Sequence, residues 1–336
     1  IITLIFYLMV IVAAAEVFTN AVESLGAKLN FSEGVTGSIF AAVGTALPES
    51  MVPLVAIITG DNQHISEEVG VGAILGAPFM LSTLAMFLLG AGAWKFMGLR
   101  EKPSITPEKT GFRRDMEFFL FSFTIAFLVA FTPYEYRMLR MFVALVLVLT
   151  YFYYVLETVK ASEALVKHGH GTHSPKDLYL SLIFKDHMFF VVVQLLFALA
   201  LIILGAKGFV HGVETLAGAL KIPVIALSLL IVPIATELPE KMNSIIWIRK
   251  GRDTMAMGNI TGAMVFQGSV LPAVGIFLTP WTANLTVVTS SIFTIIAAVW
   301  LYLFALRARG LKSSNLIING ALYIAFVIIV IFREAL

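Results

Sequence analysis

Long apolar stretches alternate with short polar connectors along the whole chain of 336 residues. Each stretch approaches or exceeds the roughly 20 apolar residues that an α-helix needs to cross a bilayer. The pattern therefore predicts an all-α polytopic membrane protein with ten transmembrane helices. They are expected at residues 1–27, 33–59, 67–92, 115–132, 137–160, 186–218, 222–248, 255–278, 284–307 and 314–333.

The composition agrees with this pattern and removes several classes of function. The chain is 59% hydrophobic and 13% charged, and its mean hydropathy is +0.93. A soluble core of this length does not need so much apolar surface, so the expected surroundings are a lipid bilayer. The net charge of +2 does not suggest a nucleic-acid partner, and the absence of cysteine excludes disulfides and thiolate metal sites.

Basic residues are concentrated in alternate connectors, which predicts an orientation. The connector at residues 161–185 contains Lys167, Lys176 and Lys185, and Lys160 directly precedes it. We expect it to be cytoplasmic, with both termini outside and the protein in the plasma (inner) membrane. The basic connectors are 93–114, 161–185, 249–252 and 307–312, and those on the opposite side are 61–68, 132–140, the one near Lys221, and 280–284.

The central connector also holds His168, His170 and His173 among glycine and proline. A solvated linker is the favoured interpretation, and weak metal binding is the alternative. The connector divides the chain into a first five-helix repeat (1–160) and a second five-helix repeat (186–336).

An internal repeat relates the two halves. At an offset of 191 residues, the core Thr-x-Leu-Pro-Glu of residues 45–49 recurs at residues 236–240, and beyond residue 60 the offset becomes 186. Each half contains five predicted spans, an odd number, so the halves must have opposite orientations in the membrane. Inverted repeats of this kind are typical of secondary transporters, whose sites lie near the midplane.

The repeated motif predicts one cation site shared by both halves. Glu49 and Glu240 each follow a proline halfway along an apolar segment, where a carboxylate is costly and usually functional. Proline breaks the helix and frees a carbonyl four residues earlier, at Gly44 or Ala235. These oxygens suit a hard cation, and the hydroxyls of two threonines one turn before the glutamates would add ligands. The threonines are Thr45 and Thr236. The alternative is a pair of protonated glutamates that are hydrogen-bonded in the bundle core.

The second copy of the motif adds polar groups that the first copy lacks. Glu237 stands where the first copy has Ala46, and Lys241 follows at the favourable Glu-to-Lys spacing. We expect these two charges to pair, unless both point into a wet vestibule. Gln267 and Asn259 lie on the eighth predicted helix, where an amide would ligate a cation or hydrogen-bond a glutamate. Glycines on that helix and on the third are expected to serve packing. They are Gly72, Gly76, Gly258 and Gly262.

These motifs resemble those of the cation/calcium exchanger superfamily, the sodium/calcium exchanger-like membrane proteins. The resemblance covers essentially the whole chain. It implies ten helices in two inverted repeats, alternating access by sliding of the first and sixth helices, and a cation site that includes residues 44–49 with Ala46 at the family's serine position. The sequence departs from the family at Ala77, Leu81, Ala263 and Gln267, which occupy positions of polar ligands.

We therefore expect a secondary-active antiporter that exchanges Ca²⁺ or a related divalent cation for Na⁺ or H⁺. Glu49 and Glu240 would bind the metal. Because several sodium ligands are absent and burial favours protonated carboxyls, a proton-coupled transporter is the first alternative. A cation channel or sensor on the same fold is the second. Neither enzymatic activity nor a cofactor is expected, and a monomer is a plausible oligomeric state.

Overall fold

The computed structural model describes residues 2–28, 50–58, 63–99, 104–166, 178–179, 187–220, 222–305 and 311–334. Within these ranges the protein is helical, and the sole extended pairing is an isolated antiparallel bridge between Ile105 and Leu311. The α-helices are α1 (Ile2–Lys28), α4 (Gln63–Met80), α5 (Met86–Lys95), α6 (Lys109–Val129), α7 (Arg137–Val166), α8 (Met188–Leu220), α9 (Val224–Arg249), α10 (Asp253–Gln267), α11 (Val270–Leu278), α12 (Leu285–Ala305) and α13 (Ser313–Glu334). A π-helix (Leu81–Ala85) and two 3₁₀ turns (Met97–Leu99 and Tyr134–Tyr136) join them.

The observed helices follow the predicted ranges, except that α7 continues past residue 160 to Val166 and that three further differences occur. The predicted helix at 33–59 lies mostly outside the described residues, and its residues 50–58 are helical. Helix α6 begins six residues before residue 115, because the Glu108 side chain accepts from the backbone N–H groups of its first turn. The predicted span at 255–278 is split into α10 and α11. Six helices in the described ranges are long and apolar enough to cross a membrane, so the count of ten spans stays a prediction.

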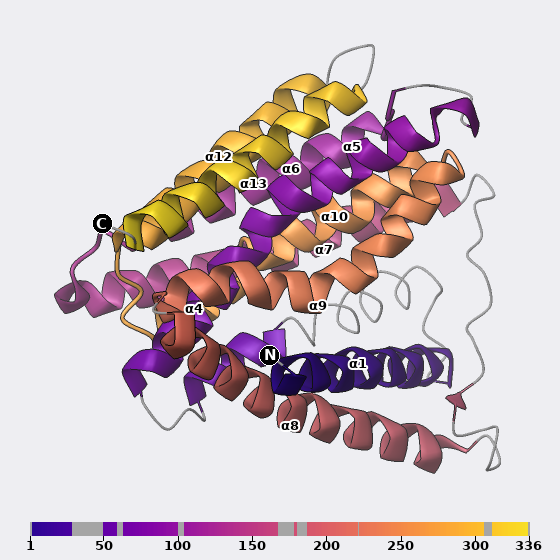
Figure 1. The fold of residues 1–336 in the computed structure, drawn as a ribbon. Helices are drawn as coiled ribbons and strands as arrows, with labels where there is room; N and C mark the ends of the chain where they lie inside the picture. The colour runs from indigo at the N-terminus through magenta and orange to yellow at the C-terminus, as the bar shows by residue number, and fades with distance from the viewer. Residues whose placement is uncertain are drawn as a thin grey trace.

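Helices α1 and α8 form a pair that lies along one side of the remaining bundle (Figure 1). Glycines of α8 let the two backbones approach. A Cβ atom on Gly205 would stand 2.9 Å from the Ile11 side chain, and one on Gly212 would stand 3.3 Å from Leu4. The outer surface of α8 is apolar and exposed, as a bilayer-facing helix requires. Its exposed residues include Phe189, Leu196, Phe197 and Leu204.

The Gly-x-x-x-Gly pair of α4 packs directly on the backbone of α9. A Cβ atom on Gly72 would lie 2.6 Å from the Ile225 carbonyl oxygen, and one on Gly76 would lie 2.8 Å from the Leu229 Cα. The Ser228 hydroxyl donates to the Val69 carbonyl at 2.6 Å across the same contact. The packing role expected for these two glycines is therefore what the geometry shows.

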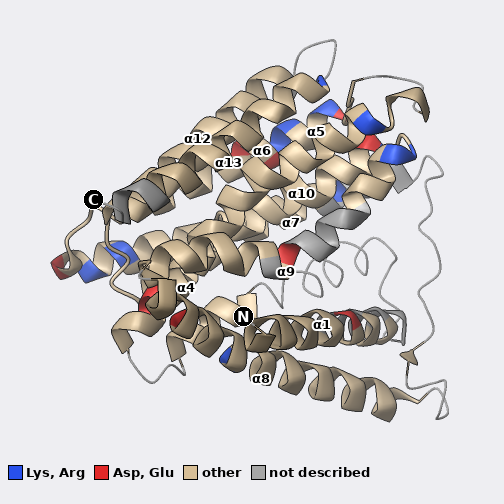
Figure 2. Ribbon diagram, in the orientation of Figure 1, with Lys and Arg blue, Asp and Glu red and all other residues tan. Residues whose placement is uncertain are grey.

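Connectors and helix ends meet at one end of the bundle. Arg249 stacks on the Phe96 ring at 5.6 Å, and Thr106 N–H donates to Asp253 at 2.8 Å. These contacts bring together residues 95–99, 104–109 and 249–253, which we call the basic end. Figure 2 shows ribbon segments of Lys and Arg, in blue, at this end of the bundle.

The opposite end is held by a buried arginine. Arg140 is 1% exposed, and it donates to the carbonyls of Thr132, Pro280 and Trp281. Its guanidinium also lies 5.4 Å from the centre of the Tyr134 ring. One side chain thus joins the connector before α7 to the connector before α12.

Candidate functional site

The second copy of the motif lies in the middle of α9. The helix runs without interruption from Val224 to Arg249, so Pro239 does not break it, contrary to the expectation from sequence. Proline still removes one backbone donor, which leaves the Ala235 carbonyl without its usual helical partner. Helices α4 and α10 pack against α9 and hold it in a geometry that an isolated helix would lose. The proline therefore modifies one rung of the hydrogen-bond ladder.

Two predicted residues of this motif have described side chains. Glu237 is 0% exposed, so it does not point into a wet vestibule. Thr236 is half-buried, and its hydroxyl donates to the Val232 carbonyl at 3.0 Å, which leaves the oxygen lone pairs as possible ligands. A buried carboxylate directly after a threonine in a membrane helix has the composition of a cation or proton site.

Both halves carry an irregular helix segment at the same point of the repeat. In the first half, α4 passes into the π-helix Leu81–Ala85. In the second half, α10 ends at Gln267, and Gly268 and Ser269 interrupt the helix before α11. Under the offset of 186, Leu81 corresponds to Gln267. Irregular backbone within membrane helices is typical of ion sites, because it exposes backbone carbonyls.

The irregular segments are supported by polar contacts. In the first half, the Ser82 carbonyl accepts from the Asn319 amide of α13 at 2.7 Å. In the second half, the Ser269 hydroxyl donates to the Val265 carbonyl at 2.5 Å. Gln267 itself is 0% exposed. The sequence predicted Gln267 as a site residue, but nothing in the apolar run predicted the helix break beside it.

Asn259 connects α10 to the motif helix. Its amide donates to the Ser244 hydroxyl at 3.0 Å. Ser244 follows Glu240 by one helical turn, so this contact ties the middle of α10 to α9 close to the motif. That position agrees with the tuning role expected for Asn259 and does not test it.

Several predicted site residues cannot be placed. The first copy of the motif, with Gly44, Thr45, Ala46 and Glu49, lies outside the described residues. The same holds for the histidines of the central connector. Ala235, Glu240 and Lys241 belong to the α9 backbone, but their side chains are not described. The shared glutamate site and the Glu237–Lys241 pair therefore remain predictions. The part of the chain that is described brings together no group of three His, Asp or Glu side chains suited to a metal ion.

Asp115 is a buried acidic residue that the sequence did not single out. Asp115 on α6 is 6% exposed, and it accepts from Tyr154 on α7 and Thr261 on α10. In the sequence it lies between a basic connector and an apolar run, a position typical of a residue at the membrane–water interface. The placement of Thr261 opposite it depends on packing between α6 and α10, which no local pattern reveals.

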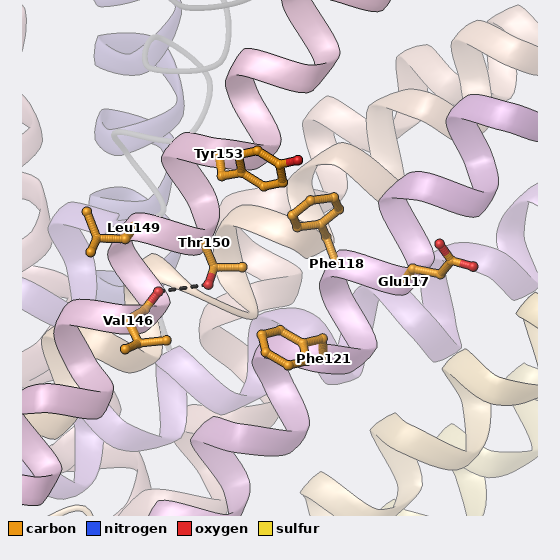
Figure 3. A pocket seen from close by; sticks show the side chains of 7 residues that line it. All are labelled: Glu117, Phe118, Phe121, Val146, Leu149, Thr150 and Tyr153. Carbon is orange, nitrogen blue, oxygen red and sulfur yellow. Dashed lines mark hydrogen bonds between the residues drawn. The ribbon is translucent and has the colours of Figure 1, made fainter.

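A groove of about 480 Å³ lies between α6 and α7 on the outer surface. Figure 3 shows Phe118, Phe121 and Leu149 among its lining residues, with the Thr150 hydroxyl donating to the Val146 carbonyl. Its lining is mostly apolar, and Glu117 at its margin accepts from Arg113 and Tyr302. The groove is a bilayer-facing surface feature and shares no residue with the α9 motif.

Comparison with known proteins supports the architecture. The family model described as sodium/calcium exchanger protein matches residues 1–159 and 190–333. CaxA of Alkalimonas amylolytica is 25% identical over 331 residues, which cover 95% of this chain and 94% of CaxA. The chain belongs to the sodium/calcium exchanger protein family, and it is a multi-pass integral membrane protein of the cation/calcium exchanger superfamily.

Solved structures with the same fold are more distant in sequence. The H⁺/Ca²⁺ exchanger CAX has a TM-score of 0.71 at 20% identity, covering 98% of this chain and 81% of CAX. The sodium-calcium exchanger NCX_Mj has a TM-score of 0.57 at 22% identity, covering 96% of each chain. The fold is therefore that of exchanger membrane proteins.

Proposed function

We propose that this protein is a secondary-active antiporter that exchanges Ca²⁺ or a related divalent cation for Na⁺ or H⁺ by alternating access. The observation that carries the proposal is the pair of irregular helix segments at Leu81–Ala85 and at residues 268–269. They occur at matching points of two halves that both belong to the exchanger family match. A symmetric pair of irregular segments is the backbone arrangement that a shared midplane ion site uses.

Within this proposal, Glu49 and Glu240 bind the divalent cation, and Thr45 and Thr236 add oxygen ligands. Backbone at Gly44, Ala46 and Ala235 completes the site, and Glu237 and Gln267 shape it. Support for the two latter roles comes from their complete burial. Lys241 and Asn259 tune the site. CAX and NCX_Mj exchange calcium by name, which makes Ca²⁺ the first cation to test.

The oxygen ligands that remain at the site indicate which counter-ions to test. Leu81 and Ala77 are buried apolar residues at positions where the resemblance implies polar ligands. Fewer neutral oxygens weaken sodium binding, whereas a buried carboxylate accepts a proton without further ligands. We therefore place H⁺ beside Na⁺ as the counter-ion to be tested. The proposed layout has repeats at 1–160 and 186–336, a cytoplasmic connector at 161–185, both termini outside and a plasma-membrane location.

The test is gradient-driven Ca²⁺ uptake into proteoliposomes, with Na⁺ and H⁺ gradients imposed separately. Wild-type protein should accumulate Ca²⁺ under at least one gradient, and Glu49→Gln and Glu240→Gln should reduce uptake to the background of empty liposomes. Glu157→Gln is the matched control, because Glu157 is 39% exposed and pairs with Lys160 away from α9. Ca²⁺ entry that neither gradient drives, or that survives both substitutions, would contradict the proposal.

A further inference from the structure

Asp115 joins three helices through its carboxylate. Its Oδ1 accepts from the Tyr154 hydroxyl of α7 at 3.0 Å, and its Oδ2 accepts from the Thr261 hydroxyl of α10 at 2.6 Å. Both partners are hydroxyls, which can donate or accept. The contact with α10 falls two residues after Asn259, on the helix that ends at Gln267.

A cavity of about 250 Å³ reaches this carboxylate from the basic end. It is roomy enough to hold several water molecules. Asp115 lies about 9 Å along α6 from the first residue of that helix, since a helix rises 1.5 Å per residue. Water can therefore deliver a proton to Asp115 without crossing the bilayer core. Polar residues at the cavity wall include Glu108, Arg114, Thr158 and Thr254.

The Thr261 hydroxyl has two acceptors within reach. Besides Asp115 Oδ2, its oxygen lies 3.1 Å from the Met257 carbonyl. A hydroxyl has one proton, so it serves one acceptor at a time. With Asp115 ionised, Thr261 donates to Oδ2. With Oδ2 protonated, the new O–H donates to the Thr261 oxygen, and the Thr261 proton turns to the Met257 carbonyl. Both protonation states are satisfied without movement of the backbone.

We propose that Asp115 is a proton-binding site of this exchanger. The proton reaches Asp115 through the cavity at the basic end, and its binding changes the contact with α10 through Thr261. The proton comes from water in the cavity and adds to one carboxylate oxygen, so no other bond forms or breaks. Ionised Asp115 receives two charge-assisted hydrogen bonds, and protonation converts them to weaker neutral ones. Protonation therefore loosens the attachment of α10 to α6 and α7.

The surroundings favour a proton over a metal ion as the ligand. The Arg114 guanidinium lies 3.7 Å from Asp115 Oδ1, and it opposes a divalent cation more strongly than a singly charged proton. Both carboxylate oxygens already have hydroxyl partners, so a metal would have to displace them. A proton needs only one lone pair of one oxygen.

The other titratable groups near Asp115 are few. On its own helix they are Arg114 and Glu108. Partial burial raises the pKa of Glu108, but the N–H groups of Gly111 and Thr110 together with Arg114 outweigh it and lower this pKa overall. From α7 the facing group is Tyr154, from α10 it is Asp253 at the helix start, and from α12 it is Tyr302, which is bonded to Glu117 on another face of α6. Helix α11 contains no titratable residue.

A direct test is infrared difference spectroscopy of the purified protein during a pH titration. The carbonyl stretch of a protonated carboxyl should appear as the pH falls, and Asp115→Asn should remove that component. Thr261→Val and Tyr154→Phe each take one donor from the ionised form, so the midpoint should move up by about one pH unit or more. Thr158→Val is the matched control, since Thr158 lines the same cavity but donates to the Tyr154 carbonyl.

An unchanged band in Asp115→Asn, or an unmoved midpoint in both hydroxyl variants, would overturn the proposal. If Asp115→Asn does not fold, the two hydroxyl variants decide the question by themselves. The link to α10 rests on the proposed exchange, and it predicts that the pH profile of Ca²⁺ uptake shifts in Thr261→Val as the infrared midpoint does. Infrared titration needs no transport, so failure of the proton site and failure of the exchange proposal are distinguishable.

Discussion

Arg140 shows how one residue decides the structure of a whole end of the bundle. Its guanidinium is buried, and its donors satisfy backbone carbonyls of two connectors that are far apart in sequence. Trp281, which it contacts, has a positive φ of 43°, a conformation that is uncommon outside glycine. The Trp281 indole N–H in turn donates to the Ala126 carbonyl at 2.9 Å. These contacts together fix a backbone conformation that the connector would not adopt alone.

Replacing Arg140 with methionine should destabilise the protein by about 3 kcal/mol, because hydrogen bonds from a charged donor are lost and the buried Trp281 carbonyl and two part-buried carbonyls lose their partner. The measurement is the unfolding free energy or melting temperature in detergent. Arg137→Met is the control, since Arg137 is exposed in the same helical turn. Equal melting temperatures for the two variants would show that the carbonyls find other partners.

At the scale of elements, the contact between α4 and α9 is set by small residues. Gly72 and Gly76 bring the two backbones together, and α9 carries the second copy of the motif. In lipid, such contacts depend on close van der Waals packing more than on apolar burial. The position of the motif helix is therefore sensitive to single methyl groups on α4.

A Gly76→Ala substitution should cost about 1–3 kcal/mol of stability, because the added methyl group meets the Leu229 backbone, which cannot rotate away. Thermal unfolding in detergent is the measurement. Gly98→Ala is the matched control, because a Cβ atom there meets nothing within 4 Å. Similar melting temperatures for both variants would mean that α4 and α9 can separate at no cost.

At the scale of the whole molecule, the α1–α8 pair is distinct from the bundle beside it (Figure 1). The pair has internal polar contacts: the Gln194 amide donates to Asn20 at 2.9 Å and to the Val17 carbonyl at 3.0 Å. Its contact with the bundle is an apolar cluster that includes Val213 and Leu227. In the part of the chain that the structure describes, this cluster is built from apolar side chains, which suit the sliding of the pair in the proposed alternating access.

Cross-linking tests this division, and the absence of native cysteine removes any background. Ile11→Cys with Gly205→Cys should form a disulfide within the pair and retain Ca²⁺ uptake, because a Cβ atom on residue 205 would stand 2.9 Å from the Ile11 side chain. Val213→Cys with Leu227→Cys, cross-linked through the two thiols, should stop uptake by joining α8 to α9. Each single-cysteine variant serves as its control. Full transport after the second cross-link would refute movement of the pair as a unit.

Some features of the candidate site stand out in the sequence and others do not. The proline-flanked carboxylates at residues 49 and 240, and the buried Glu237 and Gln267, stand out because polar residues are rare in apolar runs. The break at residues 268–269 and the π-helix at Leu81–Ala85 did not stand out. They depend on distant partners, such as the Asn319 amide that satisfies the Ser82 carbonyl. Asp115 escaped notice for the same reason.

The sequence by itself determined the class of the protein, the positions of most helices and the repeated acidic motif. Those features follow from local properties: the length of apolar runs, the spacing of prolines and the identity of adjacent residues. Tertiary structure alone decided that α9 continues through Pro239, that Arg140 joins two connectors, and that Asp115 meets hydroxyls from α7 and α10. Each of these depends on which groups packing brings within hydrogen-bond distance, and no local pattern specifies that.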